Sequence, residues 1–254
     1  MTTYSSGARQ WVRQWITWKR PAGRVWKSCD ELLSPKIPHI LIAGATGSGK
    51  SVLINSMLYT ALQYAPNQKA FIFIDLKRVE LSDYKATPHC LYYADTPQKA
   101  KIALDYACNI IENRYIIMQR NGVKQFSAGG YNQIYIVIDE YAELVTLAAR
   151  DVTRQICRIA QIGRAAGVHI ILATQRPTRD IITGQIKVNL DTRIALRCAS
   201  AQDSRNIIDQ SGAELLPRYG EALLSQYGYV SKITVPLTPE EDIRARINWW
   251  AAQR

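Results

Sequence analysis

"PHILIAGATGSGKSVLINSMLY", residues 38–59, passes from an apolar run through a glycine-rich turn into a helical pattern that begins around one lysine. The turn fits the pattern G-x-x-x-x-G-K-[S/T] through Gly44, Gly49, Lys50 and Ser51. The apolar run predicts a strand before the turn, and the pattern after it predicts a helix. Because both flanks suit a phosphate-binding loop, the sequence predicts that this turn holds the phosphates of a nucleotide.

The residue types of this loop suit that chemistry. Glycines let the backbone turn its N–H groups toward phosphate, and the N-terminus of the following helix adds positive potential. Lys50 is expected to reach the terminal phosphates, and the Ser51 hydroxyl to ligate Mg²⁺. The predicted nucleotide-binding residues are Gly44, Ala45, Thr46, Gly47, Ser48, Gly49, Lys50 and Ser51.

Two carboxylates follow another apolar run, "IYIVI", and could make the bound nucleotide hydrolysable. Asp139, the first of them, is placed to hold Mg²⁺ with its water shell. Glu140, the second, is placed to polarise an attacking water. An acidic pair at a strand end is a moderate signal alone, and it becomes strong behind a phosphate-binding loop.

Two further polar residues have a functional and a purely structural interpretation. Gln175 ends the apolar run "VHIILAT" and could orient water or contact the γ-phosphate, or it could only cap the strand. Arg164 lies near a helix end that Gly167 is expected to stop. It could face the nucleotide of a neighbouring subunit, or it could only complement the helix dipole.

Composition limits the class of protein. The chain has 254 residues, 47% of them hydrophobic, and a formal net charge of +11. This length and composition allow one large domain with a proper core. No apolar run approaches the roughly 18 residues of a membrane-spanning helix, so a cytoplasmic protein is expected. The positive charge favours a polyanionic partner such as nucleic acid, with an ordinary solvated basic surface as the alternative.

Short β-branched or aromatic runs alternate with longer helical patterns, which predicts an α/β fold with a mostly parallel central sheet flanked by helices. The predicted strands are residues 39–43, 69–75, 90–94, 134–139, 168–174 and 193–198. One long helix is expected between an N-cap at Thr96 and a stop at Gly122. A final helix is expected behind an N-cap at Thr238, with Glu241 completing a capping box.

Residues 1–34 differ in character from residues 35–254, which we assign to the main domain. This first segment is basic and rich in tryptophan. The spacing of Trp11, Trp15 and Trp18 would place their rings on one helical face. Such a face could dock on the core, on a partner or on an anionic surface.

Five segments, in this order, resemble the FtsK/SpoIIIE family of DNA translocases, within the wider FtsK–HerA group of P-loop motors. They are "PHILIAGATGSGKSVLIN", "IDLKRVELSDY", "IYIVIDEYAEL", "GRAAGVHIILATQRPTRDIITGQIKVNLDTRIAL" and "DSRNIIDQSGAELL". The resemblance extends from about residue 36 to residue 230. It is far more specific than a single phosphate-binding motif.

The resemblance implies a RecA-like P-loop NTPase domain that assembles as a ring, usually a hexamer, around double-stranded DNA and moves along it by hydrolysing ATP with Mg²⁺. Lys50 and Ser51 then correspond to the Walker A pair, Asp139 and Glu140 to the Walker B pair, and Gln175 to a sensor. Ser51 and Asp139 would hold the metal. Arg164 is the best match to an arginine finger acting on the next subunit, and Arg193 is the second candidate. Arg176, Arg179 and Lys187 lie in or near the loop after Gln175 and are candidate DNA contacts, with a solvated surface as the alternative.

The chain also departs from the family pattern. It shows no membrane-spanning N-terminal region and no winged-helix module, so sequence-directed orientation on DNA is not expected. The segment "LPRYGEALLSQYGYV" around Arg218 replaces a more glycine-rich turn. The alternative function is a coupling or secretion-type ATPase of a conjugation or secretion machine, with a membrane partner docking on residues 1–34.

Overall fold

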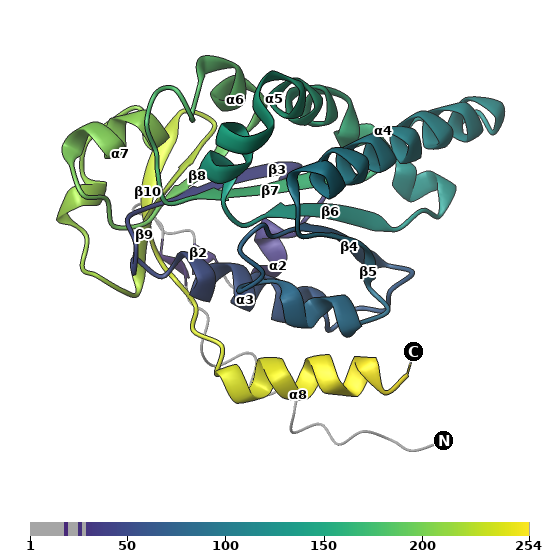
Figure 1. Cartoon of the computed structure of the whole chain (residues 1–254), viewed down its shortest axis with the longest axis horizontal. Coiled ribbons are helices and arrows are strands. Elements are labelled where there is room, and N and C mark those ends of the chain that lie inside the picture. Colours follow the sequence, from purple (N-terminus) through teal and green to yellow (C-terminus); the bar gives the residue numbers. More distant parts are fainter. Residues whose placement is uncertain (1–17, 20–24, 27–28, 254) are drawn as a thin grey trace.

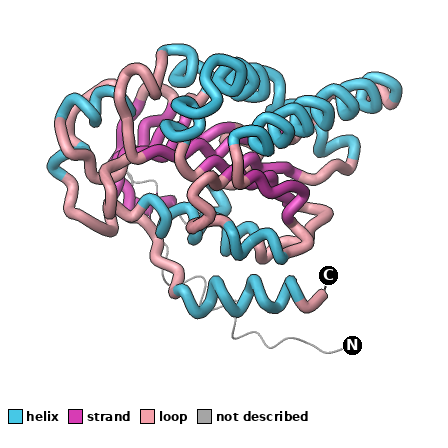
Figure 2. The backbone as a smooth tube through the Cα atoms, in the orientation of Figure 1, coloured by secondary structure: helices cyan, strands magenta, loops and turns pink. Residues whose placement is uncertain are grey.

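The computed structural model describes residues 18–19, 25–26 and 29–253, and its centre is an eight-stranded sheet (Figures 1 and 2). The strands follow the order β10-β9-β8-β3-β7-β6-β4-β5 across the sheet. Their bounds are β3 His39–Ala43, β4 Lys69–Ile74, β5 Cys90–Ala94, β6 Gln133–Ile138, β7 Val168–Thr174, β8 Thr192–Ala195, β9 Glu221–Gln226 and β10 Tyr229–Thr234. Strands β3 to β8 pair in parallel, and β9 and β10 are antiparallel. The predicted mostly parallel α/β fold is confirmed.

Helices cover both faces of this sheet (Figure 1). Helices α4, α5 and α6 lie on one face, and α2, α3 and α8 lie on the other. The bounds are α2 Cys29–Leu32, α3 Lys50–Ala61, α4 Pro97–Arg120, α5 Tyr141–Ala166, α6 Gly184–Asn189, α7 Ala201–Ile208 and α8 Glu240–Ala251. Single 3₁₀ turns are η1 Ser82–Ala86, η2 Phe126–Gly129 and η3 Ala213–Leu215. Each face has its own apolar core, so the parallel strands are buried from both sides, as their continuous apolar sequences predict.

The predicted strand at 193–198 is too long, because β8 ends at Ala195. Beyond that point the backbone makes contacts outside the ladder. The Arg197 carbonyl accepts from Ala45 N at 2.8 Å, and Cys198 N donates to the Ala213 carbonyl at 3.1 Å. The chain therefore turns away to pack against the phosphate-binding loop.

The hairpin of β9 and β10 was not predicted. Its turn is formed by Tyr227 and Gly228, with φ of 52° and 78°. Two successive residues with positive φ suit a tight hairpin whose twist matches its strands. Tyrosine is an unusual first residue for such a turn, so the sequence carried only a weak signal.

The two predicted N-caps have different outcomes. Thr96 caps α4 by accepting from Lys99 N at 3.2 Å, as expected. Thr238 does not cap α8, which begins at Glu240 after Pro239. Its hydroxyl instead donates to the Ser56 hydroxyl at 3.1 Å, so the side chain ties the segment before α8 to α3.

The N-terminal segment is described only in part. Trp18 and Trp26 pair in a small antiparallel ribbon of β1 Trp18–Lys19 and β2 Val25–Trp26, so the predicted helical face does not include Trp18. Trp11 and Trp15 lie outside the described residues. The boundary between 34 and 35 stays a prediction. Within the described ranges, no helix is both long enough and apolar enough to cross a bilayer.

Two buried histidines make the fold sensitive to acid. His39 Nδ1 accepts from Ile170 N at 3.2 Å, and His169 Nδ1 lies 3.1 Å from the Pro38 carbonyl oxygen. Burial lowers the pKa of His39 to about 4 and that of His169 to about 3. The unfolded chain, with histidine pKa near ~6.5, binds protons that the folded chain excludes.

We therefore expect the free energy of unfolding to fall as pH drops from about 6.5 toward 3. A His169→Gln variant, which keeps an N–H donor for the Pro38 carbonyl, should lose less stability over this range. Urea denaturation of both proteins from pH 7.5 to 4.5 measures the difference, and carboxylate effects common to both cancel. Parallel pH profiles would contradict the role of His169.

Candidate nucleotide site

The phosphate-binding loop, residues 44–51, connects the carboxyl end of β3 to the first turn of α3. Gly49 is the N-cap of α3 with φ of 95°, a left-handed conformation that favours glycine. No side chain caps this helix start. The first backbone N–H groups of α3 are thus available to an anion, as the sequence predicts.

Lys50 and Asp139 form a buried ion pair, although 89 positions separate them. Lys50 Nζ is 2.5 Å from Asp139 Oδ1 and 2.8 Å from the Asp139 carbonyl oxygen. The two side chains are only 3% and 4% exposed. Each charge compensates the other where water is excluded, so removing one would leave an unpaired buried charge. The fold thus joins the predicted Walker A lysine to the predicted Walker B aspartate.

Ser51 meets a carboxylate that was not singled out in the sequence. Its hydroxyl donates to Glu80 Oε1 at 2.7 Å. Glu80 lies in the irregular segment between β4 and η1. A hydroxyl with carboxylates at hand supplies the hard oxygen donors that Mg²⁺ prefers, and Mg²⁺ is usually held by one or two carboxylates plus phosphates and water. The residues present therefore fit Mg²⁺.

Glu140 is held at the carboxyl ends of β6 and β7. Its Oε1 accepts from the Thr174 hydroxyl at 2.6 Å, and its Oε2 accepts from Gln175 N at 3.0 Å. The same carboxylate caps α5 through Ala142 N at 3.3 Å. These bonds fix the carboxylate in one orientation, which suits a group that must position a water molecule.

Gln175 links this carboxylate to the phosphate-binding loop. Its side-chain oxygen accepts from the Thr46 hydroxyl at 2.8 Å, while its backbone binds Glu140. A pocket of about 430 Å³ opens at this point. It is lined by Thr46, Lys77, Glu140, Glu143, Thr146, Leu147, Gln175 and Arg176. Three residues predicted for the nucleotide site, Thr46, Glu140 and Gln175, therefore share one pocket.

The sequence places this chain among known proteins. Residues 22–135 and 127–179 match the model of the FtsK/SpoIIIE family. The chain belongs to the FtsK/SpoIIIE family. Two relatives, both named DNA translocase FtsK, come from Clostridium acetobutylicum and Caldanaerobacter subterraneus. They are 43% and 41% identical over 79% and 84% of this chain, which spans only 28% and 32% of their own lengths.

Solved structures of other proteins share this fold. The pCW3 conjugation coupling protein TcpA, solved with ATPγS, is 25% identical, with a TM-score of 0.76 over 93% of this chain and 70% of its own. EssC (ATPases 2 and 3) from Geobacillus thermodenitrificans is 19% identical, with a TM-score of 0.77 over 94% of this chain and 48% of its own. The second likeness shows a shared fold only.

The two finger candidates of this FtsK/SpoIIIE chain are absent from the lining of the pocket beside its phosphate-binding loop. Arg164 is exposed in the last turn of α5, and Gly167 ends that helix with φ of 73°. Arg193 Nη1 is bonded to Asp209 Oδ2 at 2.6 Å and to the Ile207 carbonyl at 2.9 Å. Among the residues that the structure describes, Arg164 takes part in no salt bridge, so it is the freer of the two.

The three candidate DNA contacts are not equivalent either. Arg176 and Arg179 are exposed in the loop after β7. Lys187, on α6, pairs with Asp209 at 2.7 Å and also donates to the Arg205 carbonyl. Lys187 is thus already engaged within the chain, so the two arginines are the freer candidates.

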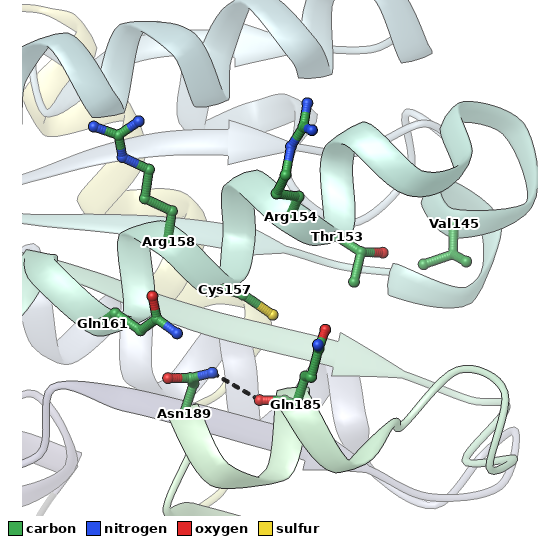
Figure 3. Close-up of a pocket in the computed structure, with 8 residues that line it drawn as sticks. All are labelled: Val145, Thr153, Arg154, Cys157, Arg158, Gln161, Gln185 and Asn189. Carbon is green, nitrogen blue, oxygen red and sulfur yellow. Dashed lines mark hydrogen bonds between the residues drawn. The ribbon is translucent and has the colours of Figure 1, made fainter.

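A second hollow, of about 850 Å³, lies between α5 and α6 (Figure 3). Arg154, Arg158 and Cys157 reach it from α5, and Asn189 and Gln185 from α6. The sequence-predicted site residues are absent from its lining. The predicted site residues Thr46, Glu140 and Gln175 line instead the pocket of about 430 Å³ at the carboxyl edge of the sheet.

Proposed function

We propose that this chain is an ATPase that uses ATP hydrolysis to move double-stranded DNA through an oligomeric ring, as a hexamer in the cytoplasm. The observation that carries the proposal is the convergence of Lys50, Asp139, Glu140 and Gln175 beside one phosphate-binding loop. DNA is proposed as the substrate because the relatives are named DNA translocase FtsK.

In this proposal each residue of the site has one task. Residues 44–51 bind the ATP phosphates, and Ser51 with Asp139 holds Mg²⁺, which neutralises phosphate charge when bound. Glu140 orients the attacking water, and Gln175 contacts the terminal phosphate. Arg164 supplies positive charge to the nucleotide of the adjacent subunit.

The proposed DNA contact is with phosphates. The chain carries a net charge of +11, and Arg176 and Arg179 are exposed beside the nucleotide pocket. Contacts to phosphate carry no sequence information and weaken steeply with salt. Movement along DNA of any sequence needs this type of contact.

A second candidate is a coupling or secretion-type ATPase. It is favoured by the likeness to the conjugation coupling protein TcpA over most of both chains. In that case a membrane-bound partner would dock on residues 1–34. The two candidates share ATP hydrolysis and differ in whether duplex DNA stimulates it.

We expect ATP hydrolysis to rise several-fold with duplex DNA, equally for unrelated sequences, and this stimulation to disappear as salt increases. An Arg176→Ala/Arg179→Ala variant should need more DNA for the same stimulation. Because Arg176 also lines the nucleotide pocket, Arg179→Ala alone is the variant expected to keep its DNA-independent rate. The control is Lys101→Ala/Arg120→Ala, which removes the same charge from exposed positions on α4. Hydrolysis rates against DNA concentration, at several salt concentrations, measure both effects. A verified oligomer that ignores duplex DNA at low salt would overturn the translocase and favour the secretion-type motor.

A further inference from the structure

Arg218 lies against the tip of the phosphate-binding loop within the same chain. A Cβ built on Gly47 would be 3.2 Å from Arg218 Nη2 and 3.7 Å from its Nε. Gly47 has φ of 73°, so glycine suits both its backbone and the close approach of the guanidinium. The contact spans from the end of β3 to the loop between η3 and β9.

The loop that carries Arg218 is anchored at both ends. Leu216 is buried, and the Gly220 carbonyl accepts from Val235 N at 2.9 Å. The guanidinium lies 5.3 Å from the centre of the Tyr219 ring, a cation–π distance. These contacts hold a long side chain over the phosphate-binding loop and reduce the entropy lost when it binds a ligand.

The charge at this position calls for an anion. Within the described ranges Arg218 takes part in no salt bridge, although nine such pairs occur elsewhere. Its neighbour is the uncapped, electropositive start of α3. A phosphate chain bound at the phosphate-binding loop would meet both the start of α3 and the guanidinium beside Gly47.

We infer that Arg218 binds the phosphate chain of the nucleotide held by its own subunit, in addition to the buried Lys50. This inference rests on the proposed function, because it requires a nucleotide at residues 44–51. Arginine suits the task, since its planar fork donates two parallel hydrogen bonds to phosphate oxygens. The contact is to phosphate and not to the base, so it does not select among nucleotides.

Arg218→Ala should weaken the binding of ATP, ADP and inorganic tripolyphosphate by about 10-fold or more, the loss expected for one charge-assisted hydrogen bond. The rate at saturating ATP should change by less than about 3-fold, since Lys50 and Glu140 remain. Arg218→Lys keeps the positive charge but lacks the planar guanidinium, so its affinity for the three ligands should lie between those of wild type and Arg218→Ala. Arg120→Ala, at the exposed end of α4, is the control for charge and should bind like wild type.

Calorimetric titration with the three ligands, together with steady-state hydrolysis, tests the inference. Unchanged affinities in Arg218→Ala, with binding lost in Lys50→Ala, would overturn it and leave the proposed function standing. A lower rate that recovers when Arg218→Ala subunits are mixed with Lys50→Ala subunits would overturn the assignment to its own subunit. Wild-type protein that binds none of the three ligands would refute the proposed function itself, and the inference with it.

Discussion

Glu140→Gln will leave ATP binding intact and slow hydrolysis by about 10²-fold to 10⁴-fold, the range for a general base. Glutamine has the size of glutamate, and its side-chain oxygen can still accept from the Thr174 hydroxyl and from Gln175 N. The carboxylate charge that polarises the attacking water is lost. ATP should therefore stay bound without being cleaved, and the assembled state should accumulate.

Lys50→Ala is the variant with which Glu140→Gln must be compared, because it is expected to lose ATP binding. Lys50 acts on phosphate charge in the ground state and in the transition state, so its loss should abolish binding as well as turnover. It also leaves the buried Asp139 carboxylate without its cation. A Lys50→Ala/Asp139→Asn variant removes both charges, and thermal unfolding of the two variants separates lost binding from a damaged fold.

Nucleotide affinity and single-turnover hydrolysis, measured on the three variants and wild type, decide the roles. Equal loss of affinity in Glu140→Gln and Lys50→Ala would contradict them. Glu143 lines the same pocket as Glu140 and is therefore a competing carboxylate. If Glu143→Gln stalls hydrolysis and Glu140→Gln does not, the water-activating group is Glu143.

The core of this site could be predicted because parallel strands bring their carboxyl ends to one edge of a sheet. Asp139 and Gln175 each end a continuous apolar run, and Gly44 follows another. Once those runs are strands of one parallel sheet, the three positions must lie close together. The position of these residues at strand ends therefore predicted that they lie close together, although the paths of the loops were unknown.

The missed contacts come from segments without periodicity. Glu80 lies in a stretch that is neither helix nor strand. No repeat of apolar residues predicts the course of the backbone there, so its hydrogen bond to Ser51 could not be predicted. Arg218 reaches Gly47 only because the chain turns away after β8 and returns as β9. Thr238 has the right spacing for a capping box, but its hydroxyl is bonded to the Ser56 hydroxyl and does not cap α8.

The two finger candidates differ in their distance from their own site, because Arg193 pairs in register with Leu41 of β3, three positions before Gly44. Arg164 precedes β7, whose seven residues end at Thr174 beside the nucleotide pocket. At about 3.3 Å per residue, roughly 20 Å of strand separates it from Gln175. An exposed arginine at this edge, without a salt-bridge partner in the described residues, is free to contact another subunit, and its place in the last turn of α5 also complements the helix dipole.

Arg164→Ala should therefore lower hydrolysis by on the order of 10³-fold while each subunit binds ATP as before. The reason is that the proposed finger stabilises charge on the γ-phosphate of the ATP in a neighbouring subunit and does not contact the ATP of its own subunit. Arg193→Ala is the matched comparison, since its guanidinium is already engaged by Asp209 and the Ile207 carbonyl. In that variant, the free energy of unfolding should fall clearly, whereas the hydrolysis rate should change little.

Mixed rings test the direction of the contact. A Lys50→Ala subunit cannot bind ATP but still offers Arg164, and an Arg164→Ala subunit binds ATP but offers no finger. Where an Arg164→Ala site faces the Arg164 of a Lys50→Ala neighbour, one complete site forms. Mixing the two inactive variants should thus restore part of the turnover, with a maximum near equal proportions. If verified mixed rings stay inactive while Arg193→Ala and Lys50→Ala subunits complement each other, the finger is Arg193 and its ion pair with Asp209 must open during each cycle.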